Sequence, residues 1–258
     1  MRETAYAKIN LALAVRGRRD DGFHEIDTLF AFAEDGDVLA VEEAEALTLD
    51  VSGPFAPEVA PGDENLVLRA ARLLGERRGA RLILDKRLPV AAGVGGGSAD
   101  AAAALRLLVR WWRLPLAESD LLPLAASLGA DVPACLLSRT VRGTGRGDVL
   151  QPAEGPRAGT PLLLVNPGVA LSTAEVFARW RPRPSSGNDL ETAARELVPE
   201  IGDLLALLSA SPGADPVRMS GSGATCFALF DSDEARDAAA ARIGALRPAW
   251  WRSATRLR

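Results

Sequence analysis

The chain has 258 residues, of which 48% are hydrophobic and 25% charged, and its formal net charge at pH 7 is −4. This length fits one large domain or two smaller ones, and the composition is that of a globular protein with a sizeable core. The negative charge, without any block rich in lysine or arginine, argues against a nucleic-acid-binding surface. The N-terminal sequence lacks an apolar signal core, and no apolar run reaches transmembrane length, so we expect a cytoplasmic protein that does not bind membranes.

Several residue types are rare in this chain. Lys8 and Lys86 are the only lysines among 30 basic residues, and His24 is the only histidine. In a chain that otherwise uses arginine, a lysine suggests a position that needs a compact ammonium. Chance is the alternative explanation for any one of these rare residues taken alone. One histidine makes a metal site of His and Cys improbable. Cys135 and Cys226 stand in apolar surroundings, which predicts buried free thiols in a reducing compartment.

Hydrophobic periodicity gives the elements of the first half. Alternation predicts a strand over residues 4–15, with Lys8 and Asn10 on one face, and further strands over 26–32, 38–41 and 47–51. An amphipathic helix is expected over 65–78 and a strand over 81–85. A helix rich in alanine follows from Ser98 to about residue 112, and another spans 116–128. After the turn 129–133, strands are expected over 135–137 and 139–143.

Proline and glycine cluster over residues 152–160, which predicts a boundary between domains 1–155 and 156–258. In the second part we expect a strand over 161–166 and a short helix capped by Ser172. One helix, or two broken near Pro199, covers 189–209. Strands over 216–219, 225–230 and 250–256 surround a helix over 233–246. This order indicates a small α/β sandwich.

The most informative stretch is glycine-rich. Four glycines fall within residues 93–97, interrupted only by Val94, and Ser98 then begins a helix. Exposed backbone N–H groups at a helix start, with the helix dipole behind them, suit a phosphate group. A flexible linker is the alternative, but linkers are polar and long, whereas this stretch has apolar flanks.

The two commonest nucleotide motifs do not fit. No lysine follows the last glycine as in a P-loop, and the glycine spacing is not that of a dinucleotide fingerprint. The stretch is therefore interpreted as a phosphate cradle of another kind. The Ser98 hydroxyl could contact a magnesium ion or a phosphate oxygen, cap the helix, or do both.

Phosphoryl transfer needs positive charge at the phosphates and a group that handles the acceptor's proton. Lys8 and Asp131 are the best candidates, because a lysine on an apolar strand needs a carboxylate partner. Turn formation or capping is the alternative for Asp131. The stretch Ser-Gly-Ser-Gly at 220–223 could close over the cradle, although an ordinary tight turn explains it equally well.

Together these motifs resemble the kinase superfamily of galactokinase, homoserine kinase, mevalonate kinase and phosphomevalonate kinase. Within it, they are most similar to the kinases of 4-diphosphocytidyl-2-C-methyl-D-erythritol, in the non-mevalonate isoprenoid pathway. The resemblance spans nearly the whole chain. The matching stretches are AKINL (7–11), DGFHE (21–25), TLF (28–30), KRLP (86–89), GVGGGSAD (93–100), GADVP (129–133), STAEVF (172–177) and SGSGA (220–224).

The resemblance implies an α+β, two-domain small-molecule kinase fold. Its N-terminal domain would be an α/β domain like domain 2 of ribosomal protein S5. Its C-terminal domain would be a ferredoxin-like α/β sandwich, with the active site in the cleft between them. The implied reaction uses ATP and Mg²⁺, and the implied partner is the small-molecule substrate alone, with no nucleic acid or membrane. We expect a monomer or weak homodimer.

The resemblance also implies residue roles. Asp131 would take the proton from the acceptor hydroxyl, and Lys8 would keep that aspartate ionised. Asn10 and His24 would bind the substrate, and Phe23 and Phe177 would sandwich its cytosine ring. The implied ATP-binding residues are Lys86, Pro89, Gly93, Gly95, Gly96, Gly97 and Ser98, with Ser98 also near magnesium.

Three positions depart from the family pattern. Many relatives have tyrosine at Phe23, a second serine at Ala99, and Gly-x-Gly-Glu where residues 145–148 read Gly-Arg-Gly-Asp. Two other functions stay open: a related kinase that phosphorylates homoserine or a mevalonate derivative, and a nucleotide-binding protein without catalysis. The nucleobase-suited set Phe23, His24 and Phe177 argues against the first. Joint retention of Lys8, Asp131 and Ser98 argues against the second.

Overall fold

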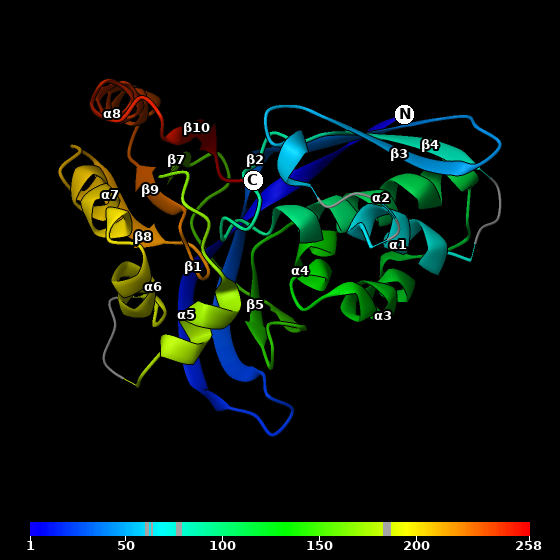
Figure 1. Ribbon diagram of the computed structural model, residues 1–258, viewed down its shortest axis with the longest axis horizontal. Helices are drawn as coiled ribbons and strands as arrows, with labels where there is room; N and C mark the ends of the chain where they lie inside the picture. Colours follow the sequence, from blue (N-terminus) through cyan, green and yellow to red (C-terminus); the bar gives the residue numbers. More distant parts are fainter. Residues whose placement is uncertain (60–61, 63, 76–78, 183–186) are drawn as a thin grey trace. The chain divides into compact units, whose positions relative to one another are not determined.

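The structure is a computed structural model that describes residues 1–59, 62, 64–75, 79–182 and 187–258. The chain divides into two compact units (Figure 1). The first comprises Met1–Lys8, Asp35–Val90 and Gly95–Arg139, and the second comprises Ile9–Glu34, Ala91–Val94 and Thr140–Arg258. The expected division into an ATP-binding and catalytic domain, 1–155, and a C-terminal domain that contributes to substrate binding, 156–258, stays a prediction.

Two long strands, β1 (Arg2–Arg18) and β2 (His24–Glu42), belong partly to each unit. The predicted strands over 26–32 and 38–41 are thus parts of the single strand β2. Gly36 allows this continuity, because a Cβ there would lie 2.0 Å from the carbonyl oxygen of Ala5. Glycine therefore lets β2 approach β1 closely without ending the strand.

In the first unit, β4 (Ala80–Asp85) lies between two other strands. It pairs antiparallel with residues 38–42 of β2 and parallel with β3 (Leu47–Ser52). A short 3-10 helix, Ala56–Glu58, follows β3. Four α-helices cluster on one side of β3 and β4 (Figure 1), namely α1 (Leu66–Leu73), α2 (Gly96–Trp112), α3 (Glu118–Leu128) and α4 (Val132–Leu137).

Helix α2 is the central helix of this cluster. It contacts α1, α3 and α4, and its alanines at 101–104 have no exposed surface. Residues 99–105 of α2 are all buried, and a helical stretch buried on all sides needs small side chains where its neighbours come close, so the alanine run serves packing as well as helix propensity. The helix begins at Gly96, two residues before the predicted start.

Two predictions for this unit need correction. Residues 135–137 are not a strand but part of α4. Residues 132–136 are all buried, without alternation, and a short apolar run of that kind does not distinguish strand from helix. The predicted helix over 65–78 ends earlier, at Leu73, and its residues 76–78 lie outside the described part of the chain.

In the second unit, β5 (Val141–Thr144) pairs with residues 28–30 of β2 and with β6 (Val149–Pro152), a strand that the sequence pattern did not reveal. A four-stranded antiparallel sheet follows, in the order β10-β7-β9-β8. Its strands are β7 (Pro161–Asn166), β8 (Ala214–Met219), β9 (Cys226–Phe230) and β10 (Trp251–Arg256).

The helices of this unit are α5 (Thr173–Arg179), α6 (Glu191–Leu197), α7 (Glu200–Ser209) and α8 (Asp233–Leu246). Helices α7 and α8 lie along the same side of the sheet (Figure 1). Their buried residues Ile201, Leu204 and Ile243 share a core with Val165 and Ala228. The succession β7–α7–β8–β9–α8–β10, with β10 beside β7, is the expected ferredoxin-like sandwich, so the α+β class is confirmed.

Local predictions in this unit also hold. Ser172 caps α5 by accepting a hydrogen bond from the N–H of Glu175, and Pro199 separates α6 from α7. Cys226, in this unit, and Cys135, in the first unit, are buried free thiols, as expected. Among the described residues, no helix has the length and apolar character needed to cross a membrane. Cytoplasmic location and oligomeric state stay predictions.

Candidate active site

Lys8 and Asp131 meet in the first unit. The Nζ atom of Lys8, on β1, lies 3.4 Å from Oδ2 of Asp131, and the Lys8 side chain is 4% exposed against 35% for Asp131. Asp131 immediately precedes α4, but its side chain makes no capping hydrogen bond to that helix. The capping alternative is therefore wrong. The carboxylate thus faces a buried ammonium while its side chain is partly accessible.

The start of α2 packs against this ion pair. Gly95 has a left-handed backbone with φ of 65°, and a Cβ added there would lie 3.0 Å from Cε of Lys8. Only glycine accommodates both the positive φ and this approach without strain. The first unit thus places Gly95, where the glycine-rich loop enters α2, directly beside the Lys8–Asp131 pair.

The loop backbone suits an anion. Ala91, Gly93 and Gly95 all have positive φ values, of 51°, 77° and 65°. The N–H groups of the first turn of α2 have no acceptor within the helix, and the helix dipole adds partial positive charge there. Because Gly95 occupies the N-cap position, Ser98 lies in the first turn, and the interpretation of Ser98 as the N-cap is wrong.

Lys86 forms a buried cluster with Asp37 and Asp100. Its Nζ lies 2.6 Å from a carboxylate oxygen of each, and the three residues are exposed by only 2%, 0% and 4%. A Cβ on Gly96 would lie 3.0 Å from this Nζ, so the Lys86 cluster lies directly against the first residue of α2. The ammonium that we expected to contact ATP is thus paired with two carboxylates. Its role as an ATP ligand stays a prediction.

The charges within the Lys86 cluster follow from burial and pairing. Burial disfavours the ammonium, but the carboxylates of Asp100 and Asp37 outweigh it and raise the pKa of Lys86. Burial, together with the negative charge of Asp37, raises the pKa of Asp100 to about 7 despite the attraction of Lys86. Within the described residues, Oδ1 of Asp100 has no hydrogen-bond partner. Lys86 therefore stays charged at neutral pH.

In the second unit, Asn10 connects to the third glycine-rich stretch. Its side-chain amide donates to Oγ1 of Thr28 at 2.8 Å, and its backbone N–H donates to Oγ of Ser220 at 3.3 Å. The Ser220 hydroxyl donates in turn to the carbonyl of Gly93, and a Cβ on Gly93 would lie 2.4 Å from the Ser220 carbonyl. The stretch 220–224 is a tight turn, as its sequence suggests, and it also supports the loop at Gly93.

Two buried polar residues here escaped the sequence analysis as individual candidates. Thr28 links Asn10 to the Ala12 carbonyl, and the amide of Asn188 donates to the carbonyls of Met219 and Gly221. No spacing pattern singles out either residue, because both act through contacts distant in sequence.

The structure places the aromatic candidates in two groups. The ring of His24 stacks on Phe177, with centroids 4.7 Å apart and planes inclined by 26°, and meets the edge of Trp180. Phe23 is 53% exposed and lies under the guanidinium of Arg146 at 5.1 Å. The structure thus brings His24, rather than Phe23, against Phe177, and adds Trp180. The cytosine sandwich stays a prediction.

The environment of His24 determines its charge. Burial, reinforced by the charge of Arg18, lowers the pKa of the His24 imidazole below its ordinary value. The ring is therefore neutral at pH 7, with one nitrogen that donates and one that accepts.

The atypical segment 145–148 packs on the start of β2. The N–H of Ile26 donates to the Gly145 carbonyl, and the N–H of Gly145 donates to the Glu25 carboxylate. Asp148 accepts from the Arg146 guanidinium, which it holds near Phe23. The segment thus contacts the DGFHE turn.

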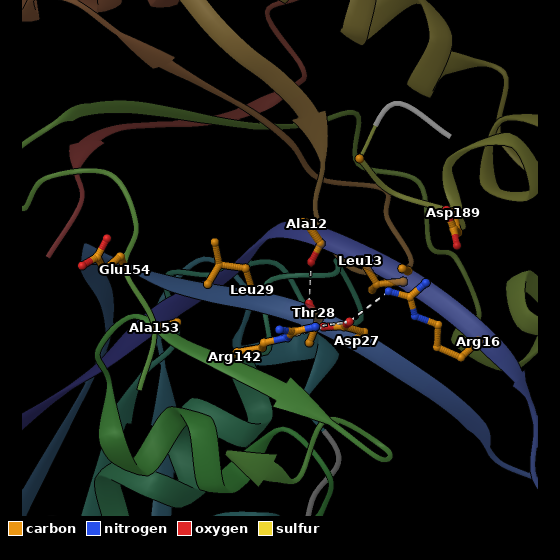
Figure 2. Close-up of a pocket in the computed structure, with 12 residues that line it drawn as sticks. Ala12, Leu13, Arg16, Asp27, Thr28, Leu29, Arg142, Ala153, Glu154 and Asp189 are labelled. Carbon is orange, nitrogen blue, oxygen red and sulfur yellow. Dashed lines mark hydrogen bonds and ion pairs between the residues drawn. The ribbon is translucent and has the colours of Figure 1, made fainter. Parts of the chain in front are cut away.

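The second unit also contains a pocket of about 620 Å³ (Figure 2). Asp27 lines this pocket, and its carboxylate accepts hydrogen bonds from Arg142 and Arg16. None of the predicted site residues is among the described residues that line this pocket, but Thr28, which lines it, accepts a hydrogen bond from Asn10. Its lining comprises Ala12, Leu13, Ala14, Arg16, Asp27, Thr28, Leu29, Arg142, Ala153, Glu154, Gly187 and Asp189.

Comparison with known proteins identifies the family. Residues 65–139 match the GHMP kinases N terminal domain, and residues 177–247 match the GHMP kinases C terminal domain. A 4-diphosphocytidyl-2-C-methyl-D-erythritol kinase from Rhizorhabdus wittichii is 54% identical, over 99% of this chain and 94% of its own. One from Cereibacter sphaeroides is 48% identical, over 98% of each. The chain belongs to the 4-diphosphocytidyl-2-C-methyl-D-erythritol kinase family of GHMP kinases.

A solved structure agrees with this assignment. The crystal structure of a 4-(cytidine 5'-diphospho)-2C-methyl-D-erythritol kinase matches with a TM-score of 0.84 and 36% identity, over 100% of this chain and 99% of the other. The family resemblance and the fold expected from it are therefore confirmed. The roles of individual residues in this kinase are proposals, developed below.

We predict that Gly95→Ala lowers the kcat of this kinase about tenfold or more, because the new Cβ displaces Lys8 from Asp131. Gly75→Ala is the matched control. Gly75 has a similar φ of 68°, but a Cβ there meets nothing within 4 Å in the described part of the chain. Both variants should lose about 1 kcal/mol of stability in urea unfolding, from the left-handed backbone alone. Equal kcat values for the two variants would contradict the prediction.

A second prediction concerns Asp27 and pH. Hydrogen bonds from Arg142, and then Arg16, lower the pKa of Asp27 from 3.8 to about 2. A carboxyl with a lowered folded-state pKa stabilises the fold above its unfolded pKa and loses that effect as pH falls through the folded value. Because the arginines are solvent-exposed, Asp27→Asn should cost about 1 kcal/mol at pH 7.

This cost should shrink between about pH 4 and pH 2, as followed by urea unfolding. Asp50→Asn, which removes an exposed partner of Arg81, serves as the control and should cost about 0.5 kcal/mol or less. An Asp27→Asn cost that is constant from pH 7 to pH 2 would show that the ion pairs are not its cause.

Proposed function

We propose that this protein transfers the γ-phosphoryl group of ATP to the 2-hydroxyl of 4-diphosphocytidyl-2-C-methyl-D-erythritol. The observation that supports this most is the Lys8–Asp131 pair packed against Gly95 at the start of α2. It puts a carboxylate, a buried ammonium and a helix N-terminus side by side. Those are the groups that phosphoryl transfer requires.

In the proposed reaction, the acceptor oxygen attacks the γ-phosphorus while its proton passes to the Asp131 carboxylate. The bond from the γ-phosphorus to the bridging oxygen breaks, and ADP leaves. Asp131 is suited to this task because a third of its side chain is accessible. Lys8 orients the carboxylate and neutralises charge on the transferring group, and its burial strengthens both effects.

ATP phosphates would bind the backbone N–H groups of Gly96, Gly97 and Ser98 at the start of α2. In the described part of the chain, no group of three His, Cys, Asp or Glu side chains could hold a metal ion. Mg²⁺ commonly keeps few protein ligands beside water and phosphate oxygens, so a site with the Ser98 hydroxyl and the ATP phosphates fits it. When bound, Mg²⁺ would neutralise phosphate charge.

The cytidine end would bind the aromatic residues of the second unit. Phe177 offers a flat face on which a pyrimidine can stack. The neutral imidazole of His24 can both donate and accept, which matches the mixed donor and acceptor edge of cytosine. Phe23 and Asn10 complete the proposed substrate-binding set. Acceptors such as homoserine or mevalonate have no nucleobase that could stack on these rings.

A coupled assay of ADP release tests the function, with 4-diphosphocytidyl-2-C-methyl-D-erythritol, homoserine and mevalonate as alternative acceptors. We expect turnover with the cytidine compound alone, because it alone can stack on Phe177. Turnover with homoserine or mevalonate, and none with the cytidine compound, would refute the proposed substrate. ATP binding without turnover on any of the three would favour the non-catalytic alternative.

Asp131→Asn is the control for the assignment of the base. It keeps the shape of the side chain and should retain ATP affinity, but should reduce turnover by about 100-fold or more. A variant that kept the wild-type kcat would exclude Asp131 as the base and leave the substrate assignment intact.

A further inference from the structure

Arg106, on the third turn of α2, joins the two elements that hold Lys8 and Asp131. Its Nε donates to the Glu3 carboxylate at 2.7 Å, and one terminal nitrogen donates to the Thr4 carbonyl at 3.0 Å. Both acceptors lie on β1, a few residues before Lys8. The Arg106 side chain is only 18% exposed.

The other terminal nitrogen of Arg106 reaches α4. It donates to the Cys135 carbonyl at 2.8 Å, the Leu136 carbonyl at 3.1 Å and the Ser138 hydroxyl at 3.3 Å. Carbonyls in the last turn of a helix have no partner within that helix. Arg106 supplies one, so it anchors the C-terminal end of the helix that Asp131 precedes.

Only a short stretch of each element separates its contact with Arg106 from the ion pair. Helix α4 has six residues and is therefore about 9 Å long. Residues 4–8 of β1 span about 13 Å. A helix of six residues is unstable alone, so its position depends on tertiary contacts. A shift at the Arg106 end of either element therefore moves Asp131 or Lys8.

We propose that Arg106, on the helix that begins at the phosphate loop, is a positioning residue that sets the distance between Lys8 and Asp131. The inference rests on the proposed function, in which these two residues act. The separation of 3.4 Å is already long for a salt bridge, so a shift of 1 Å would separate the two charged groups. The planar fork of arginine reaches both elements at once, whereas the single ammonium of lysine cannot.

A residue that served stability alone would behave differently. Its removal would lower the melting temperature but leave kcat unchanged at temperatures where the variant is folded. A positioning residue lowers kcat while leaving the KM values for ATP and the acceptor nearly constant, because neither ligand touches it.

The test compares Arg106→Met, Arg106→Lys and Arg110→Met in steady-state kinetics, well below the melting temperature of each variant. Arg106→Met should lower kcat about 10- to 100-fold, with both KM values within about twofold of wild type. Arg106→Lys should fall between wild type and Arg106→Met. Arg110, one turn further along α2, pairs with Glu3 from an exposed position and is the matched control. Arg110→Met should keep the wild-type kcat.

A wild-type kcat in Arg106→Met, whatever its melting temperature, would overturn the inference. If Arg106→Met does not fold, Arg106→Lys decides: a kcat lowered several-fold supports the inference, and an unchanged kcat overturns it.

Failure of the proposed function would be seen separately, as a wild-type protein without turnover. Hydrogen–deuterium exchange then tests the positioning role without an activity. Arg106→Met should speed exchange in α4 relative to α3 at least tenfold more than Arg110→Met does. Equal exchange in the two variants would overturn the inference.

Discussion

The buried ammonium of Lys86 is the constraint on which the rest of the candidate site depends. It joins β2 through Asp37, the segment after β4 through its own backbone, and α2 through Asp100. Unpaired, each buried charge would cost several kcal/mol, so the fold tolerates the cluster only when all three groups meet. The start of α2 is thereby fixed. Gly95 then fixes Lys8, Lys8 meets Asp131, and Arg106 holds the far ends of the elements that carry them.

The glycines of the loop have a second explanation besides phosphate binding. Gly93 makes room for the Ser220 carbonyl, Gly95 for the Lys8 side chain, and Gly96 for the Lys86 ammonium. At each of these glycines, the space that a side chain would occupy is taken by a different neighbouring group of the protein. The backbone that lies close to these neighbours on one side is also the backbone that would bind phosphate on the other. A substitution here acts on packing and on nucleotide binding together, which is why matched controls are needed.

Sequence reasoning found the elements with clear periodicity, the glycine-rich loop and the two unusual lysines. It missed the partners of Lys86, because Asp37 lies 49 positions away and no local pattern marks an aspartate that will be buried. It assigned 135–137 to a strand, because a short apolar run has no period that separates helix from strand. The resemblance assigned Phe23 and Phe177 to a sandwich around the cytosine, which stays a prediction. No pattern indicated that His24 stacks on Phe177, since side-chain direction in a turn is decided by tertiary contacts such as that between Phe23 and Arg146.

The most direct test of this account measures ATP affinity by calorimetry, together with urea unfolding, in two variants of the Lys86 cluster. Lys86→Met leaves two buried carboxylates unpaired, so it should lose about 3–5 kcal/mol of stability and most of its ATP affinity. The triple variant Lys86→Met, Asp37→Asn and Asp100→Asn removes every charge of the cluster. If Lys86 acts by holding the start of α2, stability and ATP affinity should return together in the triple variant. A triple variant as stable as wild type that still fails to bind ATP would contradict the account and show that the ammonium contacts the nucleotide.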